Sequence, residues 1–399
     1  MGYGGGSGSG GSGGSGGGSG AAGGSGYRRV GDDRTANLKV DNITNRTGTD
    51  GTEVDGIVEV NTTAHFIPPS GTTAERGSRG RAVSGGGIQP AKSNSLCYFT
   101  ISTTGNAVDF GDLSVARQSP RAVASSTRGI FLGGNDAGAP TFNTIDYITI
   151  SSTGNALDFG DWVSNGTVYR GTPTDGISNN GQTAFSNQTR GIFVGGYTRN
   201  ADANSGYRGI DYLTIATKGN TTSFGEVGKV WYSANGGACA TSTRGVYNLG
   251  NTPNPGVSPD QTNNIEYVTI ATTGNGTYFG DLDVDLSANA AVTNSTRGVW
   301  GGGQSPTVSS PSRTNIINYL TMSTLGNAQD FGDLNNTTRS INSSCNLTRG
   351  TFNGGTTPSR IDVIDYITFS TTGNATDFGN LTAVQSHGGG CSDSHGGLA

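Results

Sequence analysis

Two short stretches of the chain decide its fold. Residues 121–134 read RAVASSTRGIFLGG, and residues 145–161 read IDYITISSTGNALDFGD. Each stretch holds two runs of strand-favouring residues around a tight polar turn. Gly and Asn in the second turn tolerate the positive φ that a hairpin turn requires. The two stretches therefore predict four strands, which we call A, B, C and D, over residues 122–125, 130–134, 145–151 and 156–161.

The same landmarks recur in the same order along the chain, so the four strands form one unit of a repeat. A Thr-Arg-Gly turn recurs around Arg128, Arg190, Arg244, Arg297 and Arg349. A tyrosine in strand C recurs at Tyr98, Tyr147, Tyr212, Tyr267, Tyr319 and Tyr366. A Phe-Gly pair recurs at Phe110, Phe159, Phe224, Phe279, Phe331 and Phe378. Six units of this kind, about 54 residues apart, are typical of a six-bladed β-propeller.

The two ends of the repeat predict how the ring closes. The first unit begins with strand B at residues 81–86 and has no strand A before it, whereas the last complete unit ends near Asn380. One more piece like strand A follows at residues 387–393, and it aligns His395 with the repeated arginine. The C-terminal piece is therefore expected to complete the first blade and to pair its open edge.

Composition supports an all-β class and divides the chain. Glycine supplies 70 of 399 residues and charged residues only 13%, which is unusual for a helical protein. Residues 1–26 are almost entirely Gly and Ser, and we expect a flexible tether. Residues 27–71 are expected to form a small β connector, and residues 72–399 the propeller. The net charge of −5 without a basic stripe argues against nucleic acid, and no apolar run or leader pattern predicts membrane insertion or export.

The repeat resembles that of kelch and galactose-oxidase propellers. Strand B ends in Gly133-Gly134, Tyr147 follows 13 residues later, and Phe159 stands where those repeats have tryptophan. The TGN–DFGD block at residues 153–161, with the Gly/Ser-rich N-terminus, resembles structural and tail-fibre-associated proteins of bacteriophages, particularly phages of marine cyanobacteria. The resemblance covers about residues 79–399 and implies a virion protein. The copper ligands of galactose oxidase have no counterpart, so its activity is not implied.

The strand order predicts which face of the propeller binds. The A–B and C–D turns share one face and are short and alike, whereas the B–C and D–A connections on the other face vary in length. Varied loops on a rigid scaffold suit binding, since aromatic rings stack on sugars and arginine binds acidic groups. The alternative is that these side chains only pack the loops. The candidate ligand-binding residues are Trp162, Tyr169, Arg170, Tyr197, Arg199, Tyr207, Arg208, Trp231 and Tyr232.

The periodic arginines are expected to be structural, each in an ion pair within or between blades. Two carboxylates compete as the partner: the residue after Phe-Gly, such as Asp161, and the residue before it, such as Asp158. The paired replacements Asn380 and His395 favour the first, whereas strand direction favours the second, so the choice stays open. Trp300 takes the place of Phe131 on strand B and is expected in the core.

No metal and no cofactor is expected. The four cysteines form no CxxC pair and are predicted to be free, buried and apolar in role. His387 and His395 flank Cys391, but the glycine run at residues 388–390 opposes a helical metal face. The aspartates of residues 281–285 lack the glycine and the distal glutamate of an EF-hand.

These observations predict a non-enzymatic phage virion protein, made in the host cytoplasm and carried in the particle. Its N-terminal segment would contact other virion proteins, and its variable loop face would attach to a host surface glycan or protein. One alternative is a purely architectural component, such as a head decoration or a tail spacer. Another is an enzyme acting on polysaccharide, which needs two nearby carboxylates, and the loop acids are Asp175, Asp202 and Asp260.

Overall fold

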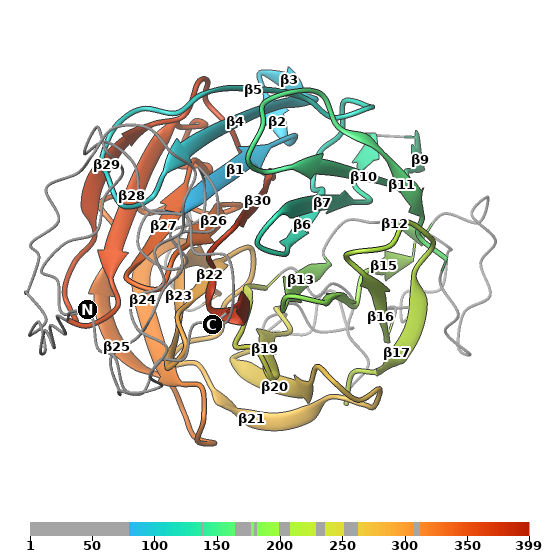
Figure 1. The fold of residues 1–399 in the computed structure, drawn as a ribbon. Helices are drawn as coiled ribbons and strands as arrows, with labels where there is room; N and C mark the ends of the chain where they lie inside the picture. Colours follow the sequence, from blue (N-terminus) through green and yellow to red (C-terminus); the bar gives the residue numbers. More distant parts are fainter. Residues whose placement is uncertain are drawn as a thin grey trace, which may run out of the picture. The chain divides into compact units, whose positions relative to one another are not determined.

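The protein forms a ring of six four-stranded antiparallel sheets (Figure 1), which confirms the predicted six-bladed β-propeller. The computed structural model describes residues 80–136, 139–163, 177–178, 182–198, 208–228, 236–250, 262–306 and 312–398. The predicted tether and connector, residues 1–26 and 27–71, lie outside this part of the chain.

Each blade has the predicted order A, B, C and D, from the ring axis outward. The A strands are β30 (Gly389–Ser392), β6 (Arg121–Ala124), β13 (Thr183–Ser186), β18 (Ala238–Ala240), β22 (Ala290–Thr293) and β26 (Asn342–Cys345). The B strands are β1 (Arg81–Gly85), β7 (Arg128–Leu132), β14 (Arg190–Val194), β19 (Arg244–Asn248), β23 (Arg297–Gln304) and β27 (Arg349–Asn353). The C strands are β4 (Ser95–Thr100), β10 (Thr144–Thr149), β16 (Gly209–Thr214), β20 (Asn264–Thr269), β24 (Arg313–Thr321) and β28 (Val363–Thr368). The D strands are β5 (Val108–Asp112), β11 (Leu157–Asp161), β17 (Thr222–Glu226), β21 (Thr277–Asp281), β25 (Gln329–Asp333) and β29 (Thr376–Asn380).

The hydrophobic core lies between neighbouring blades. One cluster joins Val83 and Phe110 of the first blade to Phe131 and Ile150 of the second. The B strands contribute to the clusters on both sides, and after its first residue every residue of β7 is buried. Trp300 of β23 is fully buried in one such cluster, which confirms its predicted place in the core. Burial on both faces explains why apolar side chains can follow one another along a B strand, as in residues 130–132 of β7.

The C-terminal strand closes the ring as predicted. Strand β30 pairs antiparallel with β1, and this register places Cys391 opposite Val83 and Ser392 opposite Ala82. Strands far apart in sequence therefore lie side by side at the closure (Figure 1). The alignment of His395 with the repeated arginine is wrong. Arg81, at the start of β1, takes that position, because its register with Thr100 matches that of Arg128 with Thr149.

A repeated backbone contact explains the Phe-Gly and Gly-Asn motifs. A bulge in β11 turns the Phe159 carbonyl toward the next blade, where it accepts from Gly219 N (3.0 Å). Asp161 N donates to the Asn220 side chain at 2.9 Å. A Cβ at Gly160 would meet the Gly219 carbonyl oxygen at 2.5 Å, so this approach requires glycine. The equivalent backbone pairs are Phe110/Gly154, Phe224/Gly274, Phe279/Gly326, Phe331/Gly373 and Phe378/Gly105.

The turn asparagines serve this contact. We expected Asn in the C–D turn because it tolerates positive φ, but no such asparagine is among the non-glycine residues with positive φ in the described part of the chain. Each instead accepts a hydrogen bond from the backbone of the preceding blade, as Asn155 does from Asp112 N (3.0 Å).

The repeated arginines form a second set of contacts between blades. Arg190 Nη1 donates to the Ile270 and Ala271 carbonyls of the next blade, at 2.8 and 2.9 Å. Its guanidinium lies 4.8 Å from the centre of the Tyr212 ring. Equivalent arginine–tyrosine pairs occur in the other five blades: Arg81/Tyr98, Arg128/Tyr147, Arg244/Tyr267, Arg297/Tyr319 and Arg349/Tyr366.

The predicted ion pairs of these arginines are therefore wrong. Neither Asp161-type nor Asp158-type carboxylates receive the guanidinium groups, whose acceptors are main-chain carbonyls across the blade boundary. Each tyrosine in turn meets the phenylalanine of its Phe-Gly pair edge to face, as Tyr212 meets Phe224 at 5.9 Å. Stacking on tyrosine and bonding to carbonyls together position the arginine without any acid.

The register at the closure can be tested with one cysteine. In V83C the new thiol faces the native Cys391 thiol across the β1–β30 pair, at a separation suited to a disulfide. Because both thiols are buried in the folded ring, the variant is refolded from urea with a mild oxidant, which should join them. Mass spectrometry of unreduced peptides should then find residues 83 and 391 linked. The V83C/C391S variant should stay unlinked. A cross-link from residue 83 to another cysteine, or none, would contradict the register.

The arginine contact should contribute to stability. In R190A two charge-assisted bonds and the ring contact are lost, so the free energy of unfolding should fall by about 2–3 kcal/mol. Urea denaturation measures the change. K218A is the matched control, because exposed Lys218 only covers the Tyr147 ring, 5.0 Å away, and its loss should cost under about 0.5 kcal/mol. Equal losses in both variants would refute the structural role of Arg190.

Candidate functional site

The varied connections share one face, where a recurring frame holds them. In each of five blades, the incoming D–A connection pairs with that blade's own B–C loop. Four of these pairs are single bridges, Ile88/Ser386, Gln118/Asn135, Ser287/Gln304 and Arg339/Thr356. The fifth is the short sheet of β12 (Ile177–Ser178) and β15 (Tyr197–Thr198). Two further hairpins, β2 (Ile88–Gln89) with β3 (Ala91–Lys92) and β8 (Asn135–Asp136) with β9 (Ala139–Thr141), arise from B–C loops.

Trp162 is not an exposed ring, contrary to expectation. Its side chain is only 6% exposed and packs with Phe193 and Leu213 between the second and third blades. Its indole Nε1 donates to the Asp211 carboxylate at 2.9 Å. Trp162 therefore fastens the start of a D–A connection to the core. The expectation failed because the residue follows strand D directly, where the other blades also bury an apolar residue, such as Leu113.

Arg208 lies at the base of the loop face and is half-buried. Its Nη2 donates to the Val227 carbonyl at 3.2 Å and lies 3.8 Å from the Glu226 carboxylate. Its charge therefore has a partner within its own blade. Tyr197 is part of β15, but its side chain lies outside the described residues. The remaining candidates also lie outside them: Tyr169, Arg170, Arg199, Tyr207, Trp231 and Tyr232. Their role as ligand contacts stays a prediction.

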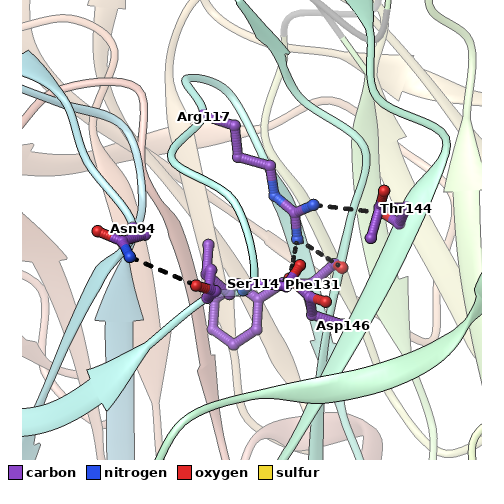
Figure 2. Close-up of polar contacts among 7 residues, drawn as sticks. Asn94, Ser114, Arg117, Phe131, Thr144 and Asp146 are labelled. Atoms are coloured by element: carbon purple, nitrogen blue, oxygen red, sulfur yellow. Dashed lines mark hydrogen bonds and ion pairs between the residues drawn. The ribbon is translucent and has the colours of Figure 1, made fainter.

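A buried ion pair anchors another D–A connection (Figure 2). Arg117 Nη2 lies 2.8 Å from the Asp146 carboxylate, and both side chains are 0% exposed. The same guanidinium donates to the Phe131 and Thr144 carbonyls, and Ser114 donates its N–H and its hydroxyl to Asp146. Burial lowers the pKa of Arg117, while Asp146 opposes that effect. Such a pair is costly to break from one side, so this connection is held in one conformation.

Asp146 belongs to a position that the sequence analysis missed. The residue before the repeated tyrosine is polar in most blades, and in five of them it accepts a bond from the D–A connection of the preceding blade. The six residues are Cys97, Asp146, Asp211, Glu266, Asn318 and Asp365. A polar residue inside an otherwise apolar C strand was the available signal, because buried polar groups need hydrogen-bond partners.

Small side chains line the axis of the ring. The middle positions of the A strands facing it are Ala122, Ala184, Ala238, Ala291, Ser343 and Gly390. They enclose a cavity of about 100 Å³ near the A–B turns and another of about 60 Å³ toward the loop face. Six strands converge there, so larger side chains would not fit. No carboxylate lines either cavity in the described part of the chain.

His395 lines the first cavity, next to the C-terminal 3-10 turn (Gly396–Leu398). Its Nε2 lies 2.9 Å from the Ala124 carbonyl, and its Nδ1 accepts from Gly397 N at 3.2 Å. A carbonyl only accepts, so the Nε2 nitrogen carries the proton in the neutral ring. Burial lowers the pKa of His395 to about 4. The neutral histidine thus ties the C-terminus to β6.

The cysteines are free and buried, as predicted. Burial raises the pKa of Cys345 to about 11 and that of Cys391 to about 12, so both remain thiols. No group of three or more potential metal ligands gathers among the described residues. Within residues 281–285, the Asp281 carboxylate accepts from Asn264 and Tyr278.

No family model matches the chain, and no curated protein sequence matches it. No helix in the described part is long and apolar enough to cross a membrane.

Acid should weaken the closure. The pKa values of His387 and His395 are both lowered to about 4, so between pH 6.5 and 4 the unfolded chain binds more protons than the folded one. Stability should therefore fall as the pH falls through this window, by about 1–3 kcal/mol for each histidine. Urea denaturation at pH 7.5, 6 and 5 measures it.

Two variants test whether His395 causes this dependence of stability on pH. H395Q keeps a donor toward Ala124 and should flatten the pH dependence, whereas H65Q, before the propeller, should not. Raised pKa values at Asp365 and Asp393 act in the opposite direction, so the difference between variants carries the test. An unchanged slope in H395Q would contradict it.

Proposed function

We propose that this protein is a non-enzymatic component of a bacteriophage particle, with a kelch-type propeller whose B–C/D–A loop face attaches to a host surface glycan or protein. Residues 1–71 would link the propeller to other virion proteins. The repeat block and the Gly/Ser-rich N-terminus support the phage assignment. Its place would be the particle, after synthesis in the host cytoplasm.

The observation that supports attachment through this face is the contrast between the two ends of the blades. The C–D turns are committed to contacts between blades, because their Gly and Asn bind the preceding blade in all six cases. On the loop face, bridges and the polar residue of strand C hold only the bases of the connections. Beyond these bases, loop length and sequence differ between blades. Residues that make no contact between blades are available to bind a ligand.

Absence of enzymatic activity is part of the proposal. Hydrolysis of a glycosidic bond needs two carboxyl groups across the bond. The lining of both axial cavities consists of backbone, apolar side chains, cysteines, hydroxyls, amides, Arg121 and His395. This lining supports binding rather than hydrolysis within the described part of the axis.

One observation favours a purely architectural role as the second candidate. Val108 and Leu157 begin the outermost strands of two adjacent blades, and they are 50% and 58% exposed. Apolar side chains on an outer strand suit contact with a neighbouring subunit. In that case V108K and L157K should impair incorporation into the particle.

Binding to cells tests the attachment proposal. The labelled full chain should bind host bacteria, with marine cyanobacteria examined first. Y169A/R170A and W231A/Y232A should weaken binding at least about tenfold, since each removes a large aromatic anchor. L325A and K218A change exposed residues of C–D turns on the opposite face and should leave it unchanged. Failure to bind any cell or envelope glycan would count against attachment, and equal loss in the control variants would exclude this face.

A further inference from the structure

Four cationic or titratable side chains converge at the axial end of the loop face, beside the 60 Å³ cavity. We call Arg121, Arg339, Arg360 and His387 the axial cation cluster. Backbone contacts bring their segments together: His387 accepts from Ser119 N and donates to the Ser340 carbonyl, at 2.7 and 2.9 Å. Thr356 bridges to both Arg339 and Arg360. The cluster therefore unites residues from three connections with the first residue of β6.

The two outer arginines of the cluster have neutral partners. Arg339 donates to the Gln304 side chain, and Arg360 Nε donates to the Ser386 hydroxyl at 3.2 Å. The same hydroxyl lies 3.1 Å from His387 Nδ1. Neither guanidinium forms an ion pair in the described part of the chain, in contrast to Arg117 with Asp146 and Arg208 with Glu226. The chain has a net charge of −5, so Arg339 and Arg360 are a local concentration of positive charge.

The cavity beside the cluster has the size and lining for a small anion. Arg121, Asn342 and Gly388 line it, and no carboxylate does. Since a water needs about 10–15 Å³ by a comparable measure, about 60 Å³ holds a few waters or one oxyanion. It is too small for a sugar ring. Burial and the three arginines lower the pKa of His387 to about 4. Burial is the larger cause, and the contribution of the three arginines indicates a positive potential at His387, which favours an anion.

We propose that the axial cation cluster binds an oxyanion, a carboxylate or a sulfate, that projects from a larger ligand on the loop face. Arg339 and Arg360 supply the charge-assisted donors, and Arg121 at the start of β6 lines the adjacent cavity. The inference rests on the proposed function only for the source of the anion, which would be an acidic surface polysaccharide.

Inorganic sulfate tests the site directly, using the full chain at pH 7 and calorimetric titration against sodium chloride of equal ionic strength. The wild type should bind sulfate with millimolar affinity. R339Q and R360Q should each weaken binding about fivefold or more, because each removes charged donors. K218Q removes one positive charge at a C–D turn and should leave affinity unchanged. No sulfate-specific binding, or equal weakening in K218Q, would overturn the proposal. Arg360 is exposed, so R360Q should retain the wild-type melting temperature.

A second experiment distinguishes the anion site from the proposed attachment to host cells. Sulfated and uronate oligosaccharides should bind the wild type better than a neutral glucan and should lose that preference in R360Q. If sulfate binds at the cluster but the chain binds no cell, attachment fails and the site stands. If the chain binds cells equally well with and without Arg360 and binds no sulfate, the site fails and attachment stands.

Discussion

The ring depends on the approach of two backbones at every blade boundary. At Gly160 a Cβ would lie 2.5 Å from the Gly219 carbonyl oxygen, so the strand must lack a side chain there. The bulge in β11 buries the Phe159 ring and presents its carbonyl to Gly219 N. A single two-residue motif thereby fills the core between blades and fixes their spacing. This explains why Phe-Gly recurs six times while other positions of the repeat vary.

Closure follows from the same contact. Five boundaries join units consecutive in sequence, but the sixth joins Phe378 to Gly105 and Arg349 to the Ile101 and Ser102 carbonyls. Six contacts of one geometry require the sixth blade to meet the first, and β30 completes the first blade beside β1. The buried, neutral His395 joins the segment after β30 to β6 through the Ala124 carbonyl. Protonation of this histidine would therefore weaken the closure of the ring.

The blades and their closure could be predicted from the sequence because the same landmarks recur in each unit, and a recurring unit keeps the same buried positions in every blade. It did not predict the partners of the arginines, because main-chain carbonyls leave no mark in side-chain identity. Trp162 was placed at the surface because a D–A connection was treated as loop from its first residue, whereas that residue is core. His395 was aligned by chain order, although Arg81 at the other end of the repeat takes the position. Of the loop-face candidates, the structure locates the side chains of Trp162 and Arg208, and both are engaged by neighbouring groups.

The two faces of the propeller differ in how far their residues can vary without altering the contacts that repeat at each blade boundary. A substitution in a C–D turn alters a bond to the preceding blade, as Asn220 shows with Asp161. On the loop face, contacts between blades are made by the bases of the connections, as Arg117 shows with Asp146, and loop length varies beyond them. Arg339 donates to Gln304 of the preceding blade, and Arg360 donates to Ser386 of the connection into the first blade. Neither arginine takes part in the arginine–tyrosine contacts that recur at every blade boundary. Positive charge at the axial end of the loop face therefore lies outside the contacts that repeat at every blade boundary, so it can differ from blade to blade.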